Sequence, residues 1–159
     1  MFKVGIGQDS HRFSEADKQP LILGGVEFSS EIGFKSNSDG DVIIHALCNA
    51  LESAIGGLSF SAYADEMCEK GISDSVEYLK KALEHISEKG YKVNNIGISV
   101  EAKNPKIDPM ANQIKERLAR VLNISVEFVG ITATSGEDLT AFGQGEGVHV
   151  LAIVSLTKK

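Results

Sequence analysis

A polar loop that runs directly into an apolar helix, residues 38–45 (Ser-Asp-Gly-Asp-Val-Ile-Ile-His), constrains the fold of this chain most strongly. Apolar residues recur at helical spacing as far as Ala54, and Gly56-Gly57 follow as a helix stop. Asp39 or Ser38 is expected to cap the first turn. His45 lies in this aliphatic run and needs a partner, because an unpaired buried polar group costs about 1–3 kcal/mol. Taken alone, His45 is best interpreted as a core histidine bonded to a backbone carbonyl.

A second short stretch, near the N-terminus, changes the interpretation of His45. Asp9 and His11 stand two residues apart at the end of an expected strand, so their side chains point to the same side. With His45 they form three ligands of mixed oxygen and nitrogen type, the pattern of a catalytic zinc whose fourth position stays open. A structural zinc site would be rich in thiolates, and the chain has only two cysteines. The sequence therefore predicts a divalent metal, zinc first, at Asp9, His11 and His45.

Composition narrows the class of protein. With 159 residues, 42% of them hydrophobic and 24% charged, the chain is expected to form one globular domain over residues 1–159. A net charge of -6 argues against a nucleic-acid partner, and no apolar run reaches the roughly 18–20 residues that span a membrane. Cys48 and Cys68 form neither a C-x-x-C motif nor a disulfide framework. We expect no signal peptide and a cytoplasmic location.

Hydrophobic periodicity predicts an α/β chain of layered α+β type, with a mixed four- to five-stranded sheet and about three helices on one face. Strands are expected at Phe2–Ile6, on either side of a Gly-Gly turn within 21–28, at Val93–Glu101, Val126–Thr132 and Gly147–Val154. Helices are expected from Asp41 to about Gly56, from Ser73 or Asp74 to Gly90, and from Asp108, as N-cap, with Pro109 at the first helical position. Residues 13–20, 31–38 and 58–71 are expected to be loops, His85 to be solvated and His149 to be structural.

Two further polar segments follow expected strands. Residues 134–137 (Thr-Ser-Gly-Glu) lie where ligands commonly bind in an open α/β sheet, and Glu137 could hold Mg²⁺. An ordinary Ser/Gly turn explains this segment equally well on its own. Residues 102–108 (Ala-Lys-Asn-Pro-Lys-Ile-Asp) precede a helix and could offer backbone N–H groups to an anion or a base edge. Taken alone, they are better explained as a plain turn.

Together these segments resemble the 2-C-methyl-D-erythritol 2,4-cyclodiphosphate synthase family of the non-mevalonate isoprenoid pathway. The resemblance covers nearly the whole chain at the family's usual length. The residues that carry it are Gly7, Asp9, His11-Arg12-Phe13, Leu23-Gly24-Gly25-Val26, the 38–42 segment with His45-Ala46-Leu47, Gly90-Tyr91, Pro105-Lys106, Ala133-Thr134 with Glu137, and Gly143 with Gly145-Glu146-Gly147.

This resemblance implies a phosphorus–oxygen lyase that forms a homotrimer around a central sheet-lined core, with active sites between neighbouring subunits. It implies Zn²⁺ or another divalent transition metal at Asp9, His11 and His45, and Mg²⁺ or Mn²⁺ with the diphosphate at Glu137. The substrate would be 4-CDP-2-C-methyl-D-erythritol 2-phosphate, whose 2-phosphate attacks the β-phosphorus and expels CMP as the cyclic diphosphate closes. Catalytic roles fall on Asn37 and Ser135, substrate contacts on Ser38, Ala102, Lys106, Ile107, Asp108, Thr134, Ser135 and Glu137, and weaker contacts on Ser59, Ser61 and Gln144.

The chain departs from the family pattern at several of these positions. Asn37 stands where a histidine is usual, Ser135 where a threonine is usual, and Asn49 where an aspartate is common. Residues 59–66 differ from a loop that normally grips sugar hydroxyls, and Gln144 replaces an arginine of a central cavity that can bind isoprenoid diphosphates. Three alternatives therefore stay open: another metal-dependent phosphotransferase or phosphodiesterase on this scaffold, a non-catalytic zinc-binding trimer, and a domain whose histidines are structural.

Overall fold

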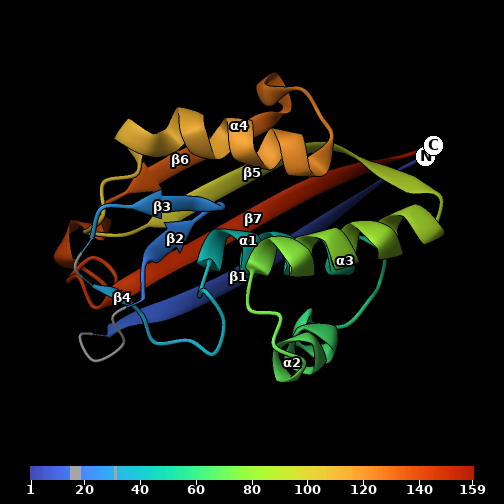
Figure 1. Ribbon diagram of the computed structural model, residues 1–159. Helices are drawn as coiled ribbons and strands as arrows, with labels where there is room; N and C mark the ends of the chain where they lie inside the picture. The colour runs from blue at the N-terminus through green and yellow to red at the C-terminus, as the bar shows by residue number, and fades with distance from the viewer. Residues whose placement is uncertain (15–18, 31) are drawn as a thin grey trace.

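The computed structural model describes residues 1–14, 19–30 and 32–159. These residues form a five-stranded mixed sheet in the order β4-β1-β7-β5-β6, a separate β2–β3 hairpin, and four α-helices (Figure 1). The strands are β1 (Phe2–Ser14), β2 (Leu21–Leu23), β3 (Val26–Phe28), β4 (Gly33–Phe34), β5 (Tyr91–Glu101), β6 (Val129–Thr134) and β7 (Gly147–Lys158). The helices are α1 (Val42–Ala54), α2 (Ser61–Glu69), α3 (Ser75–Glu88) and α4 (Ala111–Leu122).

Two long antiparallel strands form the middle of the sheet. β1 pairs with β7 from Phe2 opposite Thr157 to Arg12 opposite Gly147, so the two chain ends lie side by side. β5 lies antiparallel on the other side of β7, and β6 joins β5 in parallel. A parallel pair needs a crossover connection, and α4 supplies it between β5 and β6. The predicted mixed sheet is confirmed, with five strands.

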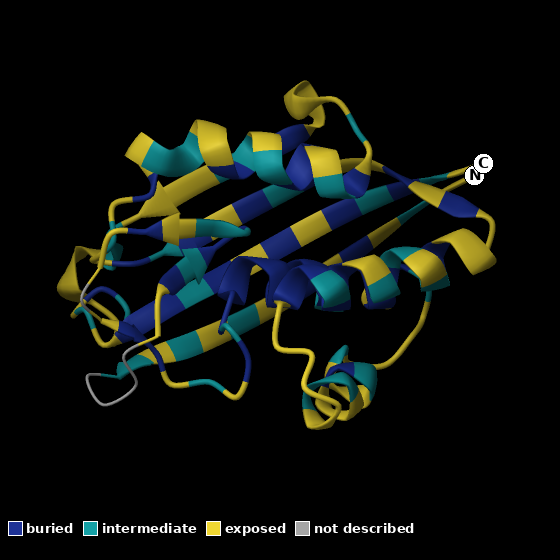
Figure 2. Ribbon diagram, in the orientation of Figure 1, coloured by how far each residue is buried: buried dark blue, intermediate teal, exposed yellow. Residues whose placement is uncertain are grey.

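The sheet has one covered face and one open face. Helices α1, α3 and α4 lie over the same face (Figure 1), and the strand side chains that point toward them are buried, as Val150 and Val154 are in β7. Residues that alternate with these along the strands are exposed or half-buried (Figure 2), and several of them are large and apolar. The apolar ones are Phe2, Val4, Ile6, Leu151 and Ile153, which we call the open apolar face. The predicted set of three helices on one face is confirmed. The chain also has a fourth helix, α2, which was not predicted.

Two glycines of β1 let α1 pack directly on the strand. A Cβ atom at Gly5 would lie 2.0 Å from the carbonyl oxygen of Ala50, and one at Gly7 would lie 2.3 Å from that of Ala46. Real side-chain atoms never approach so closely, so only glycine fits at both positions. This contact sets α1, and therefore His45, at a fixed height above the Asp9 end of β1.

The helix start differs from the prediction. Asp41 caps α1, accepting a hydrogen bond from the backbone N–H of Ile44, and the expected caps Asp39 and Ser38 do not. The fully buried Asp41 carboxylate also accepts the N–H groups of Gly24 and Gly25, at 2.8 and 2.6 Å. Burial raises the pKa of Asp41 to about 6, although these N–H groups oppose the rise. One side chain therefore joins the helix start to the β2–β3 turn.

Several boundaries are corrected. Residues 61–69 form helix α2 and not a loop, β1 extends through Ser14, and β4 lies within the expected loop 31–38. Of the expected loop 13–20, residues 15–18 lie outside the described residues. Asp108 begins a short 3₁₀ helix, Asp108–Met110, so that α4 starts at Ala111 and Asp108 is not its N-cap, and another 3₁₀ helix, Val126–Phe128, precedes β6.

One histidine was assigned the wrong environment. His85 is not a freely solvated residue, because its Nδ1 atom lies 2.7 Å from Oε1 of the buried Glu52. Its ring also meets the ring of Tyr63 edge-on, at 5.3 Å between centroids. These contacts join α3 to both α1 and α2. His149, expected to be structural, packs its ring against Phe142 at 5.4 Å.

Candidate functional site

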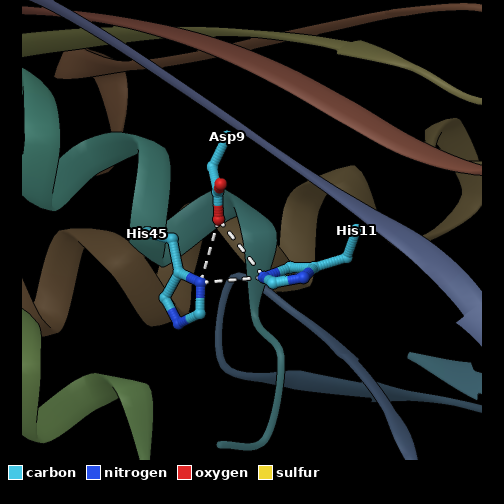
Figure 3. Close-up of side chains that lie close together, drawn as sticks. All are labelled: Asp9, His11 and His45. Atoms are coloured by element: carbon cyan, nitrogen blue, oxygen red, sulfur yellow. Dashed lines mark hydrogen bonds and ion pairs between the residues drawn. The ribbon is translucent and has the colours of Figure 1, made fainter. Parts of the chain in front are cut away.

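Three side chains from two elements converge at the carboxyl end of β1 (Figure 3). The Asp9 Oδ2 atom lies 3.0 Å from His45 Nδ1 and 3.2 Å from His11 Nε2, and the two nitrogens are 3.1 Å apart. Among the described residues these are the only His, Cys, Asp or Glu side chains that gather as a possible metal group. The predicted convergence of Asp9, His11 and His45 is confirmed. We call them the triad.

Each member of the triad is placed by a simple local rule. Asp9 and His11 alternate with exposed residues along β1 and point to the covered face of the sheet. His45 stands in the first turn of α1, which the glycine contact holds close above the strand. His45 as a whole residue is only 4% exposed, and the ring of Phe60 packs against its ring at 4.9 Å between centroids.

The electrostatics of the triad favour an ionised carboxylate. Burial raises the pKa of Asp9, but the hydrogen bonds and charges of His11 and His45 outweigh burial and hold that pKa well below its usual range. Asp9 therefore offers an anionic oxygen beside two imidazole nitrogens. Carboxylate oxygen and imidazole nitrogen are both common zinc ligands, so the donor set fits a transition metal.

The triad opens into a cavity of about 600 Å³. Two other predicted residues, Asn37 and Ser38, line this cavity. The rest of its wall comes from the segment before α1, from the N-cap of α2, and from helices α2 and α3: Lys35, Ser36, Phe60, Ala64, Asp65, Cys68 and Tyr78. Of these, the resemblance pointed only to the 59–66 segment, as the counterpart of a loop that grips sugar hydroxyls. The sequence did not predict that this segment is helical, because residues 58–71 lack an apolar period.

A second, smaller cavity of about 160 Å³ collects the other predicted contacts. It lies where β5 and β6 end, and its lining includes all of the predicted substrate residues of both segments except Glu137: Ala102, Lys106, Ile107, Asp108, Thr134 and Ser135, together with Pro105 and Ala133. The structure therefore brings the two segments together, although they are far apart in sequence. The two cavities share no lining residue.

The remaining predicted residues lie apart from the triad. Glu137 is exposed in the short 3₁₀ helix Gly136–Asp138, with its backbone in the left-handed region at a φ of 50°. Ser59 and Ser61 bond to each other at 2.9 Å between their hydroxyls, and Ser59 lines a different cavity of about 720 Å³. Gln144 is exposed and donates its side-chain amide to the carbonyl of Asp138.

The partner of His45 also differs from the simplest expectation. Its Nε2 atom meets the hydroxyl of Ser75 at 2.8 Å, and not a backbone carbonyl. Ser75 begins α3 and is fully buried. Asp39, which was expected to cap the helix, accepts the Ser75 hydroxyl and N–H instead.

Comparison with known proteins gives one consistent result. Residues 2–157 match the model of the YgbB family. The chain is 44% identical over 158 residues to 2-C-methyl-D-erythritol 2,4-cyclodiphosphate synthase of Chlamydia muridarum, covering 98% of this chain and 88% of that protein. The enzyme of the same name from Chlamydia felis is 42% identical over 158 residues, with 98% and 89% coverage.

Solved structures agree with the sequence relatives. The chain matches IspF of Plasmodium falciparum in complex with CDP with a TM-score of 0.87 and 27% identity, covering 99% of this chain and 97% of that one. It matches the bifunctional IspDF of Campylobacter jejuni with a TM-score of 0.91 and 32% identity, covering all of this chain and 43% of that one. No described helix of the present chain is long and apolar enough to cross a membrane.

Proposed function

This chain belongs to the YgbB family, and from that premise we propose that it is a 2-C-methyl-D-erythritol 2,4-cyclodiphosphate synthase. The reaction is an intramolecular phosphoryl transfer. The 2-phosphate of 4-CDP-2-C-methyl-D-erythritol 2-phosphate attacks the β-phosphorus, the bond to CMP breaks, and the cyclic diphosphate closes. The single observation that carries the proposal is the triad, with its three ligand atoms 3.0–3.2 Å apart at the mouth of a cavity.

The triad residues would hold a divalent transition metal, with zinc as the best fit to one carboxylate and two imidazoles. Such a metal supplies Lewis-acid polarisation of a phosphoryl oxygen when it is bound. Asp9 contributes a negative charge that stays in place at neutral pH, because its pKa is held low. Glu137 would offer a carboxylate to Mg²⁺ or Mn²⁺ carried by the diphosphate, since these hard ions prefer oxygen ligands and phosphates.

The chain's own polar groups would do the remaining work of positioning. Thr134 and Ser135 line the small cavity and offer hydroxyls to a diphosphate, and Lys106 adds a positive charge there. Asn37, at the wall of the triad cavity, can donate its amide to the attacking phosphate. No general base is needed, because a phosphate is already anionic at neutral pH. Positioning and charge neutralisation account for most of the catalysis expected in phosphoryl transfer.

A homotrimer would complete the site. The triad cavity and the small cavity have no residue in common, so a neighbouring copy is the natural source of the second half. The open apolar face supports the same proposal, because large exposed apolar patches mark protein interfaces. A relative of similar fold, IspF of Plasmodium falciparum, has been solved as a CDP complex, which supports a cytidine nucleotide as the ligand here.

The proposal is tested by incubating the purified protein with the CDP-methylerythritol 2-phosphate and Mg²⁺ and following phosphorus by ³¹P NMR. The expected result is equal release of CMP and of a cyclic diphosphate. CMP without a cyclic product would indicate a phosphodiesterase on this scaffold. Bound metal without turnover of any cytidine diphosphate ester would indicate a non-catalytic trimer, and either result would refute the proposal.

A further inference from the structure

A chain of hydrogen bonds runs from His45 away from the triad. The Nε2 atom of His45 lies 2.8 Å from the hydroxyl oxygen of Ser75, and that hydroxyl donates in turn to Oδ1 of Asp39. The backbone N–H of Ser75 donates to the other carboxylate oxygen of Asp39 at 3.0 Å. Ser75 is fully buried and His45 is 4% exposed, so water does not compete for the bond between these two side chains.

The bonding capacity of the three groups fixes the proton on His45. A serine hydroxyl has a single hydrogen, and an ionised carboxylate only accepts hydrogen bonds. The Asp39 carboxylate already accepts two further donors, the backbone N–H groups of Ser75 and Asp41. The Ser75 hydrogen therefore points to Asp39, and the Ser75 oxygen must accept a hydrogen from His45 Nε2. Nδ1, the atom that faces Asp9 and His11, is then the nitrogen of His45 that can offer its lone pair to a metal.

We propose that Ser75 and Asp39 are positioning residues that hold His45 in the Nε2–H tautomer, with its Nδ1 lone pair directed at the metal. This role rests on the proposed metal centre. Metal-binding histidines commonly donate their second ring N–H to a neighbouring group, which fixes the tautomer and the ring orientation. The two aspartates of the S-D-G-D loop therefore have different roles. Asp41 caps the start of α1, and Asp39 aligns His45, a ligand carried by that helix.

The hydrogen-bond chain from His45 through Ser75 to Asp39, which we call the relay, is held in place from two sides. The N–H of Asp39 donates to the carbonyl of Ser73 at 3.0 Å, so the loop before α1 is tied to the chain just before α3. Asp74 caps α3 by accepting the N–H of Val76, which fixes the backbone on either side of Ser75. The ring of Phe60 packs on the ring of His45 and limits its rotation.

The test measures the affinity of the metal-free protein for Co²⁺, a spectroscopic substitute for Zn²⁺, in wild type, Ser75→Ala and Ser73→Ala. Ser73 is exposed two residues before Ser75, so its replacement is a matched control. Loss of such a supporting contact typically weakens metal binding by about 10- to 100-fold. We expect that loss in Ser75→Ala, with a changed cobalt absorption spectrum, and wild-type affinity in Ser73→Ala.

A second measurement does not depend on the variant's folding. In the Zn²⁺-loaded wild type labelled with ¹⁵N-histidine at pH 8, His45, assigned by comparison with His45→Ala, should carry its hydrogen on Nε2 and none on Nδ1. An Nδ1–H tautomer, or Co²⁺ affinity in folded Ser75→Ala within twofold of wild type, overturns the positioning role while leaving the metal centre intact. Failure of the wild type to bind Co²⁺ refutes the metal centre itself, and the positioning role falls with it.

Discussion

The contact between β1 and α1 makes Gly7→Ala the most informative single change in this chain. A Cβ atom at Gly7 would lie 2.3 Å from the carbonyl oxygen of Ala46 and 2.3 Å from the backbone nitrogen of Ala50. An ordinary contact begins at 3.4 Å, and both neighbours are backbone atoms that cannot rotate away. Helix α1 must therefore move away from β1 by about 1 Å. This movement occurs at Ala46, the residue next to His45, so it displaces the His45 side chain as well.

That displacement sets two magnitudes. Metal–ligand distances are tolerated within about 0.2 Å, so a shift of this size at His45 should weaken Co²⁺ or Zn²⁺ binding by at least tenfold. Overpacking of a core typically costs about 1–3 kcal/mol of folding free energy. For a chain of this length, that cost corresponds to a fall in Tm of about 2–12 °C.

The assay pairs metal titration with thermal unfolding in EDTA at a fixed protein concentration. Gly130→Ala serves as the control, because its Cβ would meet its nearest neighbour, the Ile96 carbonyl oxygen, at an ordinary 3.6 Å. We expect Gly130→Ala to keep wild-type metal affinity. If Gly7→Ala also bound metal as tightly as wild type, the close approach of α1 would not be what places His45, and this reasoning would be wrong.

Three further predictions follow from the same structure. His45→Ala and Lys106→Glu should each be inactive alone, but mixed trimers assembled from equal amounts of the two should recover about a quarter of wild-type activity. The reason is that each shared site takes its triad from one copy and its Lys106 from a neighbour, and each is intact in about half of the copies. Recovery of no activity would place both halves of the site in one subunit. Lowering the pH from 7.5 to 5.5 should weaken Zn²⁺ binding in titration calorimetry, because metal ions compete with protons for their ligands. Asp9 should contribute nothing to this loss, because its depressed pKa keeps its carboxylate ionised throughout that range. Asp41→Asn should lower the unfolding free energy measured in urea by about 1–3 kcal/mol, because an amide N–H₂ would then face a buried backbone N–H.

Local patterns were sufficient to predict most of the fold and the triad. Alternation along β1 places Asp9 and His11 on one side, and helical spacing places His45 on the apolar side of α1, so each ligand direction follows from a few neighbouring residues. The Gly-Gly turn of the β2–β3 hairpin and the helix stops at Gly56 and Gly90 are likewise local, with positive φ values that glycine adopts without strain. Such signals do not depend on how distant elements pack.

The features that were missed depend on distant packing. Helix α2 has a single buried residue, Ala64, so no apolar period marks it in the sequence. The Glu52 partner of His85 lies 33 positions away, on a different helix, and the Ser75 partner of His45 lies 30 positions away. Asp39 was taken for a helix cap because cap and relay roles favour the same residue type in the same loop. Only the docking of α3 beside α1 decides between them.

The open apolar face and the divided site point to the same requirement. Asp9 and Val100 both pair with Val150, on opposite sides of β7, so the triad and the segment after β5 are separated by two strand spacings within one sheet. Their cavities share no lining residue. In the proposed trimer, burial of Ile6, Leu151 and Ile153 against other copies would supply the driving force for assembly. The same contact would bring a neighbour's small cavity to each triad, so that assembly and completion of the active site become one event.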